Sequence, residues 1–308
     1  MKKAAAQILS VQQRDVFEAV RLGQQSLSDG TPFDLAVDHG VAAALAAWSI
    51  DRGETIPGLW RDRLRQVRAQ QLRQRSDLED LRERLHASSV RWMTARGWAR
   101  TVDPILPVRP MGDVDLYTTE DQLEALADAL QPRWQLKHRS DDVWGTTRLF
   151  VDGEGRGPAV DVHLDFSLFG RRCPGAMEAA LDRRRRVVDL WLPDAEDDWL
   201  IALIESLQSA RQRSLRRHWE RQGLGTRLGP IGRRVAMERF RLRPELLDQL
   251  EQRLHCSAPE GQALRWIAAG WLQASTSRVE TLAWFARPGV AALWVRMRAT
   301  CEGLFSSS

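Results

Sequence analysis

The spacing of apolar residues divides the chain into a helical N-terminal part, a central part with strands and a helical C-terminal part. Residues 59–86 predict one long amphipathic helix, because Leu78, Leu81 and Leu85 recur every three or four positions. Before it, an alanine-rich run at residues 36–48 predicts a buried helix, and Ser10 can cap a first helix. Residues 1–88 are therefore predicted to form a helical region.

The period of the pattern changes after residue 88. Short apolar runs predict strands at residues 90–93, 113–117, 134–138, 143–151 and 159–166. A helix that ends before Pro132 is predicted after the second strand, and the glycine-rich turn at residues 152–158 suits a hairpin. Residues 89–192 are therefore predicted to form an α+β core built on a small mixed β-sheet.

The C-terminal part, residues 193–308, is predicted to be helical again. Residues 194–211 form an amphipathic pattern with acidic residues at its start, and further helices are predicted from residue 245, including the tryptophan-bearing runs 264–272 and 282–297. Residues 211–243 hold eleven arginines against Glu220 and Glu238. Such a stretch can bind a phosphate-rich partner, or it can be an ordinary solvated helix surface.

Candidate chemistry lies in the central part, where carboxylates alternate with apolar residues. In the predicted strand 113–117, Asp113 and Asp115 share one face, about 7 Å apart at Cα, and they repel one another unless a cation lies between them. Divalent ions such as Mg²⁺ take oxygen ligands of this kind. In residues 159–166, Asp161, His163 and Asp165 alternate with apolar residues. A neighbouring strand of that pattern is expected to bring a third carboxylate to the same ion.

These motifs resemble the DNA polymerase β-like nucleotidyltransferase superfamily. Within it, the chain is similar to bacterial uncharacterised nucleotidyltransferases, whose signature reads roughly Leu-Lys-Gly, then Arg-x-x-x-Asp-Ile-Asp-Leu, then Val-Asp-Leu-His. The matching residues are Ala95-Arg96-Gly97, the stretch 109–116 and the stretch 160–163. Arg96 stands where the family has lysine, and no serine follows Gly97. The likeness covers about residues 85–170.

The resemblance implies an enzyme that moves a nucleoside monophosphate from a nucleoside triphosphate (NTP), such as ATP, to a hydroxyl group. The residues implied to bind Mg²⁺ or Mn²⁺ and to act in catalysis are Asp113, Asp115 and Asp161. The residues implied to contact the nucleotide are Arg96, Gly97, Arg109 and His163. The acceptor stays open between a small molecule, a peptide, a protein and RNA.

Several alternatives remain open at this stage. One alternative to an enzyme is a catalytically inactive relative, in which the core is a scaffold and the helical parts bind RNA or a protein. Arg109 either holds a phosphate or forms a salt bridge with an aspartate of the Asp-x-Asp motif. His163 either contacts substrate or is structural, and Asp165 is an alternative to Asp161. Lys137 and His138 are further candidates on the adjoining strand.

Composition narrows the protein class. Hydrophobic residues make up 43% of the chain and charged residues 28%, which predicts a globular protein with a sizeable core. The three cysteines are far apart in sequence and lack Cys-x-x-Cys spacing, so they indicate neither a disulfide framework nor a zinc site. No run of about eighteen apolar residues occurs and the N-terminal apolar run is too short for a signal peptide, so a cytoplasmic protein without membrane contact is expected. The formal charge of +4 rests almost entirely on arginine, since there are only three lysines. The predominance of arginine over lysine fits phosphate binding and, equally, the codon usage of a GC-rich genome.

Overall fold

A five-stranded mixed sheet forms the centre of the protein. The computed structural model describes residues 11–239, apart from residues 29, 143–144, 156, 169–170, 173–174 and 209–214, so the helices predicted from residue 245 onward lie outside the described residues. The strands are β1 (Met93–Ala95), β2 (Asp113–Tyr117), β3 (Trp134–Asp142), β4 (Gly145–Asp152) and β5 (Ala159–His163). Their order is β1-β2-β5-β4-β3, with β2 and β5 parallel and the other neighbours antiparallel. This confirms the predicted α+β class and the small mixed sheet.

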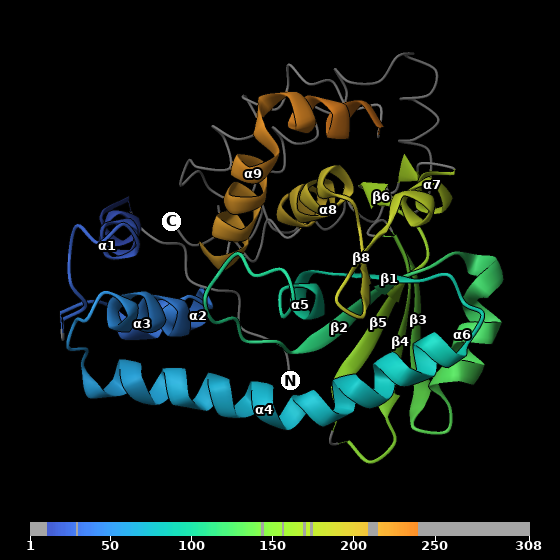
Figure 1. The fold of residues 1–308 in the computed structure, drawn as a ribbon, viewed down its shortest axis with the longest axis horizontal. Coiled ribbons are helices and arrows are strands. Elements are labelled where there is room, and N and C mark those ends of the chain that lie inside the picture. The colour runs from blue at the N-terminus through green and yellow to red at the C-terminus, as the bar shows by residue number, and fades with distance from the viewer. Residues whose placement is uncertain are drawn as a thin grey trace, which may run out of the picture.

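Helices cover both faces of this sheet (Figure 1). On one face lie α4 (Gly58–Ala87) and α6 (Leu123–Leu130), which pack against the apolar side chains of β2 and β5, Val114 and Val160 among them. On the other face lie α7 (Ala176–Arg183) and α8 (Ala195–Gln208), whose core includes Tyr117. Since side chains alternate along a strand, Asp113 and Asp115 share the face of Tyr117 and point toward the α8 side.

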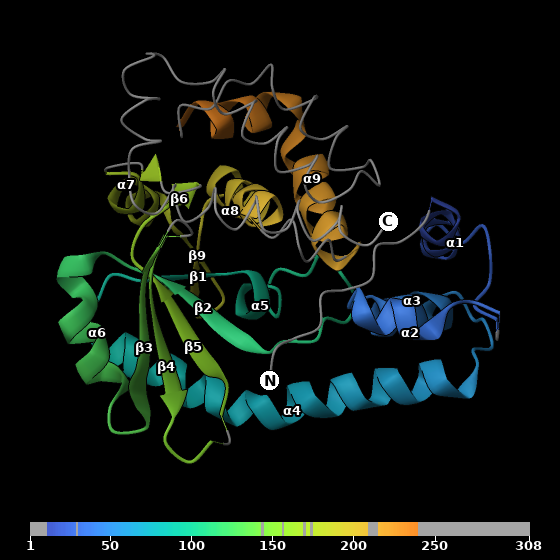
Figure 2. The same cartoon turned by 180° about the vertical axis from the view of Figure 1, so that it is seen from behind.

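Of the N-terminal helices, α3 (Ala42–Asp51) packs on the first half of α4, at the far end from the sheet, while α1 (Val11–Arg21) and α2 (Phe33–Asp38) pack on α3 (Figure 2). The prediction of one continuous helix at residues 36–48 is wrong, because the chain breaks between α2 and α3. Gly40 has a φ of +68° there, and the Val41 amide donates to the Ala36 carbonyl at 2.9 Å. This is the hydrogen bond of a glycine-terminated helix end, so Gly40 stops α2.

The last described helix, α9 (Leu215–Arg239), packs against α8 (Figure 1) and contacts the loop that precedes β2. It is kinked at Gly229, where φ is +71°, just before Pro230. The remaining described elements are α5 (Arg96–Ala99), η1 (Glu120–Gln122), β6 (Ser167–Leu168), β7 (Arg171–Arg172), β8 (Arg185–Val187) and β9 (Leu190–Leu192). Within the part of the chain that the structure describes, no helix combines the length and apolarity needed to cross a membrane.

Candidate active site

Two carboxylates and a histidine meet where β2 and β5 run side by side. The parallel register pairs Asp115 with Asp161 and Tyr117 with His163. One ligand atom from each of Asp115, Asp161 and His163 lies within 4.8 Å of the others. His163 Nε2 is 3.3 Å from Asp115 Oδ1 and 3.9 Å from Asp161 Oδ2. These three residues are called the carboxylate cluster below.

The other two predicted aspartates lie outside this cluster. Asp113 is exposed and sits opposite Ala159, two residues before Asp115 on the same face of β2. Its charge still acts on Asp161, where it favours the protonated form. Asp165 binds Thr146 of β4 instead. Its Oδ1 accepts a hydrogen bond of 3.0 Å from the Thr146 amide, and its Oδ2 lies 3.2 Å from the Thr146 hydroxyl. Asp165 therefore ties the end of β5 to β4.

Arg96 connects the cluster to the helices above it. Its Nη1 lies 2.6 Å from Asp115 Oδ1, and its Nη2 donates to Glu205 of α8. Arg217 of α9 reaches the same glutamate, with Nη2 2.9 Å from Oε1. Arg96 has a φ of +61°, a conformation that residues other than glycine rarely adopt. The arginine that replaces the family's lysine is thus bound to a buried aspartate and a glutamate.

Burial and charge give the cluster an uneven electrostatic character. Burial alone would raise the pKa of Asp115, but the charge of Arg96 and the hydrogen bond from His163 outweigh it, so this pKa lies below its ordinary value. Burial raises the pKa of Asp161 and, together with repulsion from Asp115 and Asp113, outweighs the attraction of His163. For His163, burial is outweighed by the hydrogen bond to Asp115 and the charge of Asp161, so its pKa is raised. Asp161 is therefore the carboxylate whose charge is least compensated.

Gly97 packs closely against the start of β2. A Cβ at this position would lie 2.9 Å from Arg109 Nη1 and 3.2 Å from the carbonyl oxygen of Asp113. Arg109 itself forms an ion pair with Glu220 of α9, rather than with an aspartate of the Asp-x-Asp motif. The alternative that Arg109 forms a salt bridge with Asp113 or Asp115 is therefore wrong, because its partner is Glu220. Gly97 and Arg109 together fix the loop before β2 against α5 and α9.

Replacing Gly97 with alanine is expected to lower the free energy of unfolding by about 1 to 3 kcal/mol, because the added methyl group meets backbone as well as a side chain. Denaturant unfolding measures this. Gly112→Ala is the matched control in the same loop, because a Cβ there meets nothing within 4 Å. Equal free energies of unfolding for the two variants would contradict the close packing at Gly97.

Arg216 and Arg217 of α9 lie near the cluster, and the sequence pattern did not distinguish them within its basic stretch. Arg216 donates from Nη1 to the Pro110 carbonyl at 3.2 Å, and burial together with repulsion from Arg109 lowers its pKa to about 10. Burial lowers the pKa of Arg217, and repulsion from Arg96 adds to this against the attraction of Glu205. Four arginines, called the arginine group below, thus gather beside the cluster: Arg96, Arg109, Arg216 and Arg217. Glu205 pairs with Arg96 and Arg217, and Glu220 pairs with Arg109, so two glutamates offset part of this positive charge.

Comparison with known proteins places this site in a family. The chain matches the family described as uncharacterised nucleotidyltransferase over residues 31–227, which is more than half of its length. The matched range includes β2, β5 and the four residues of the arginine group. No curated protein matches the chain. A solution structure of the antibiotic-resistance factor ANT(2'')-Ia has a TM-score of 0.39 and 15% identity, covering 58% of this chain and 95% of that chain, a likeness too slight to support an inference. The match over residues 31–227 shows that the chain belongs to the uncharacterised nucleotidyltransferase family.

Proposed function

We propose that this protein is a metal-dependent nucleotidyltransferase that moves a nucleoside monophosphate from an NTP to a hydroxyl acceptor. The observation that carries the proposal is the in-register pairing of Asp115 with Asp161 on adjacent parallel strands. Membership of the family supports transfer chemistry in general.

The donor set of the cluster fits a hard divalent cation. Asp115 and Asp161 would hold Mg²⁺ or Mn²⁺ through carboxylate oxygens, and Asp113 would add a third carboxylate from the same face of β2. His163 would orient Asp115 through their hydrogen bond rather than bind the ion, as partners of metal-binding carboxylates commonly do. When bound, such an ion neutralises phosphate charge and orients the triphosphate for in-line attack.

Phosphate binding is assigned to the arginine group. The guanidinium of Arg96 pairs with Asp115, so a cation at Asp115 would compete with it and turn its fork toward the phosphates. Arg216 and Arg217 carry charge that burial and neighbouring arginines disfavour, and an anion beside them would relieve this cost. Asp161, whose own pKa is raised, would face the acceptor hydroxyl. Gly97 lets the chain approach closely at the start of β2.

Arg216→Gln and Arg217→Gln are each expected to weaken NTP binding about tenfold or more, because each removes a charged donor. Calorimetric titration of the full chain with an NTP and Mg²⁺ measures this. Arg234→Gln is the matched control, since Arg234 is an exposed arginine on the same helix. Affinities that fall equally in the control and in the two variants would remove the arginine group from the nucleotide site.

A second candidate function is favoured by the ion pair between Arg96 and Asp115. In that reading, Arg96 permanently neutralises the buried carboxylate, and the protein is a catalytically inactive relative that binds RNA or a protein partner. One experiment separates the two candidates. The full chain is incubated with each α-labelled NTP, Mg²⁺ and a cell lysate. Transfer of label to a lysate fraction supports the enzyme. No labelling of any fraction, with or without Mg²⁺, supports the scaffold.

A further inference from the structure

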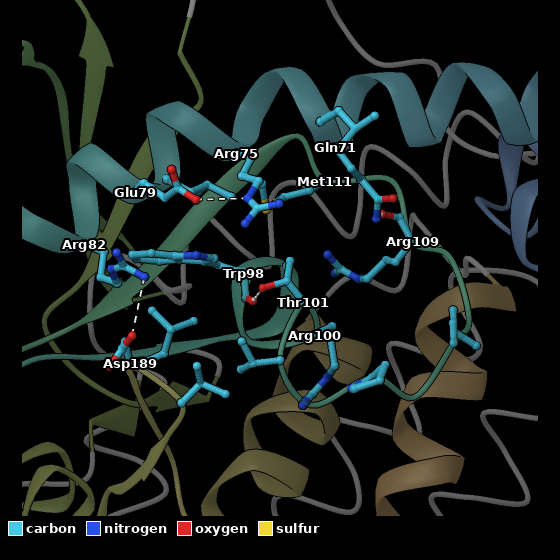
Figure 3. A pocket seen from close by; sticks show the side chains of 18 of the residues that line it. Gln71, Arg75, Glu79, Arg82, Trp98, Arg100, Thr101, Arg109, Met111 and Asp189 are labelled. Atoms are coloured by element: carbon cyan, nitrogen blue, oxygen red, sulfur yellow. Dashed lines mark hydrogen bonds and ion pairs between the residues drawn. The ribbon is translucent and has the colours of Figure 1, made fainter.

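A second site is indicated by a cavity on the α4 side of the protein. It has a volume of about 700 Å³ and lies between α4, the loop that follows α5 and the turn between β8 and β9 (Figure 3). Gly97, Trp98 and Arg109 line it, but Asp115, Asp161 and His163 do not. Its volume falls within the range of small-molecule sites, roughly 300 to 1,000 Å³. The cavity is therefore separate from the carboxylate cluster and large enough to hold a ligand.

The walls of the cavity are mainly apolar. They include Leu78, Trp98 and Leu190, of which Trp98 and Leu190 are buried. Two further apolar side chains that line the cavity are strongly exposed, Leu72 at 70% and Val188 at 72%. A ligand with an apolar body would cover both side chains as well as the buried walls. The cavity thus suits a ligand that is at least partly hydrophobic.

Arginines of α4 give the cavity its polar side. Arg68, Arg75 and Arg82 all line it and are spaced by seven residues, which places them along one stripe of the helix. Figure 3 shows the side chain of Arg75 extending from α4 toward Trp98. Arg75 is paired with Glu79 at 3.0 Å and Arg82 with Asp189 at 3.6 Å, but Arg75 is 75% exposed and Asp189 51% exposed. Exposed pairs of this kind are weak, so both arginines can turn to an anion.

The other two arginines in the wall are already paired, and one of them, Arg109, also belongs to the arginine group beside the carboxylate cluster. Arg100 is held by Asp198 and Arg109 by Glu220, both in buried ion pairs. Arg68 is exposed, and no ion pair of Arg68 is found within the described ranges. The α4 stripe therefore supplies positive charge at the edge of an apolar cavity, while the opposite wall stays fixed.

We propose that this cavity binds a small amphipathic anion. Its apolar body packs against Trp98, Leu78 and Leu190, and its carboxylate or phosphate group meets Arg75 and Arg82 on α4. This binding does not depend on the proposed transfer reaction. It requires neither a divalent metal nor the carboxylate cluster.

The test uses the full chain and three probes that share one apolar body: 1-naphthoate, 1-naphthyl phosphate and uncharged 1-naphthol. In calorimetric titrations without metal, at least one anion is expected to bind at least about tenfold more tightly than the naphthol. The preferred anion distinguishes a carboxylate ligand from a phosphate ligand. No binding of either anion, or equal binding of the naphthol, would overturn the proposal.

Variants locate the binding. The double variant Arg75→Gln/Arg82→Gln should weaken anion binding about tenfold or more, while Arg73→Gln, an exposed α4 arginine outside the cavity, should leave it unchanged. Leu72→Glu should also weaken binding, whereas Leu59→Glu, which alters an α4 leucine that is 65% exposed and outside the cavity, should not. Binding that survives these changes but is lost in Arg216→Gln would belong to the nucleotide site and overturn the proposal.

Discussion

Replacing Asp115 with asparagine should lower the rate of nucleotidyl transfer by about 10² to 10³ or more, as the loss of one preorganised stabilising group does in other enzymes. Asp115 is the most connected carboxylate of the cluster: it contacts Arg96 and His163 and lies beside Asp161. Its removal would weaken the metal site and change the position of Arg96 together. The assay is the transfer of label from an α-labelled NTP to the lysate fraction.

Asp128→Asn is the control for this variant, because Asp128 is an exposed aspartate on α6, on the opposite face of the sheet. The change should leave the labelling rate near that of the unchanged protein. Thermal unfolding of both variants shows whether Asp115→Asn remains folded. A folded Asp115→Asn variant that labels the fraction at the normal rate would remove Asp115 from the chemistry.

Replacing Asp198 with asparagine should lower the free energy of unfolding by about 3 to 5 kcal/mol, because it leaves the buried charge of Arg100 without its partner. The two side chains are only 4% and 2% exposed, and they form two hydrogen bonds of 2.9 and 2.6 Å. This pair joins the end of α5 to α8, so its loss loosens the helix that covers the carboxylate cluster. Denaturant unfolding measures the change.

A second variant separates the lost ion pair from lost packing around it. Arg100→Met together with Asp198→Leu removes both charges and keeps apolar volume, so it should recover most of the stability, because a buried ion pair and an apolar pair are often equivalent. If Asp198→Asn unfolds at the same denaturant concentration as the unchanged protein, the pair does not stabilise this part of the fold.

Local sequence patterns were sufficient to predict β2, β3, β4 and β5, but the first strand was predicted at residues 90–93 and lies at Met93–Ala95. The Asp-x-Asp and Asp-x-His motifs each occur in a short alternating run, and a strand places such residues on one face. The family resemblance then indicated that the two runs are neighbours, which the register of Asp115 with Asp161 bears out. The end of α2 at Gly40 was also present in the sequence as a glycine signal, although the alanine-rich run concealed it.

The contacts around the cluster could not be predicted in the same way. Arg96 meets Glu205 and Arg109 meets Glu220, pairs separated by 109 and 111 residues. An amphipathic pattern shows which face of a helix is apolar, but not which distant helix its polar side chains will meet. The same limit applies to Arg216 and Arg217, which in sequence are two of many arginines. Only the way α8 and α9 pack over the sheet distinguishes them.

The most direct test of a cation-dependent nucleotide site is the binding of an α-labelled NTP to the full chain with Mg²⁺, with EDTA, and in the double variant Asp115→Asn/Asp161→Asn. Saturable binding with Mg²⁺ that disappears with EDTA and in the double variant is the predicted result. Binding of equal affinity in all three cases, or no binding to the unchanged protein with Mg²⁺, would contradict it.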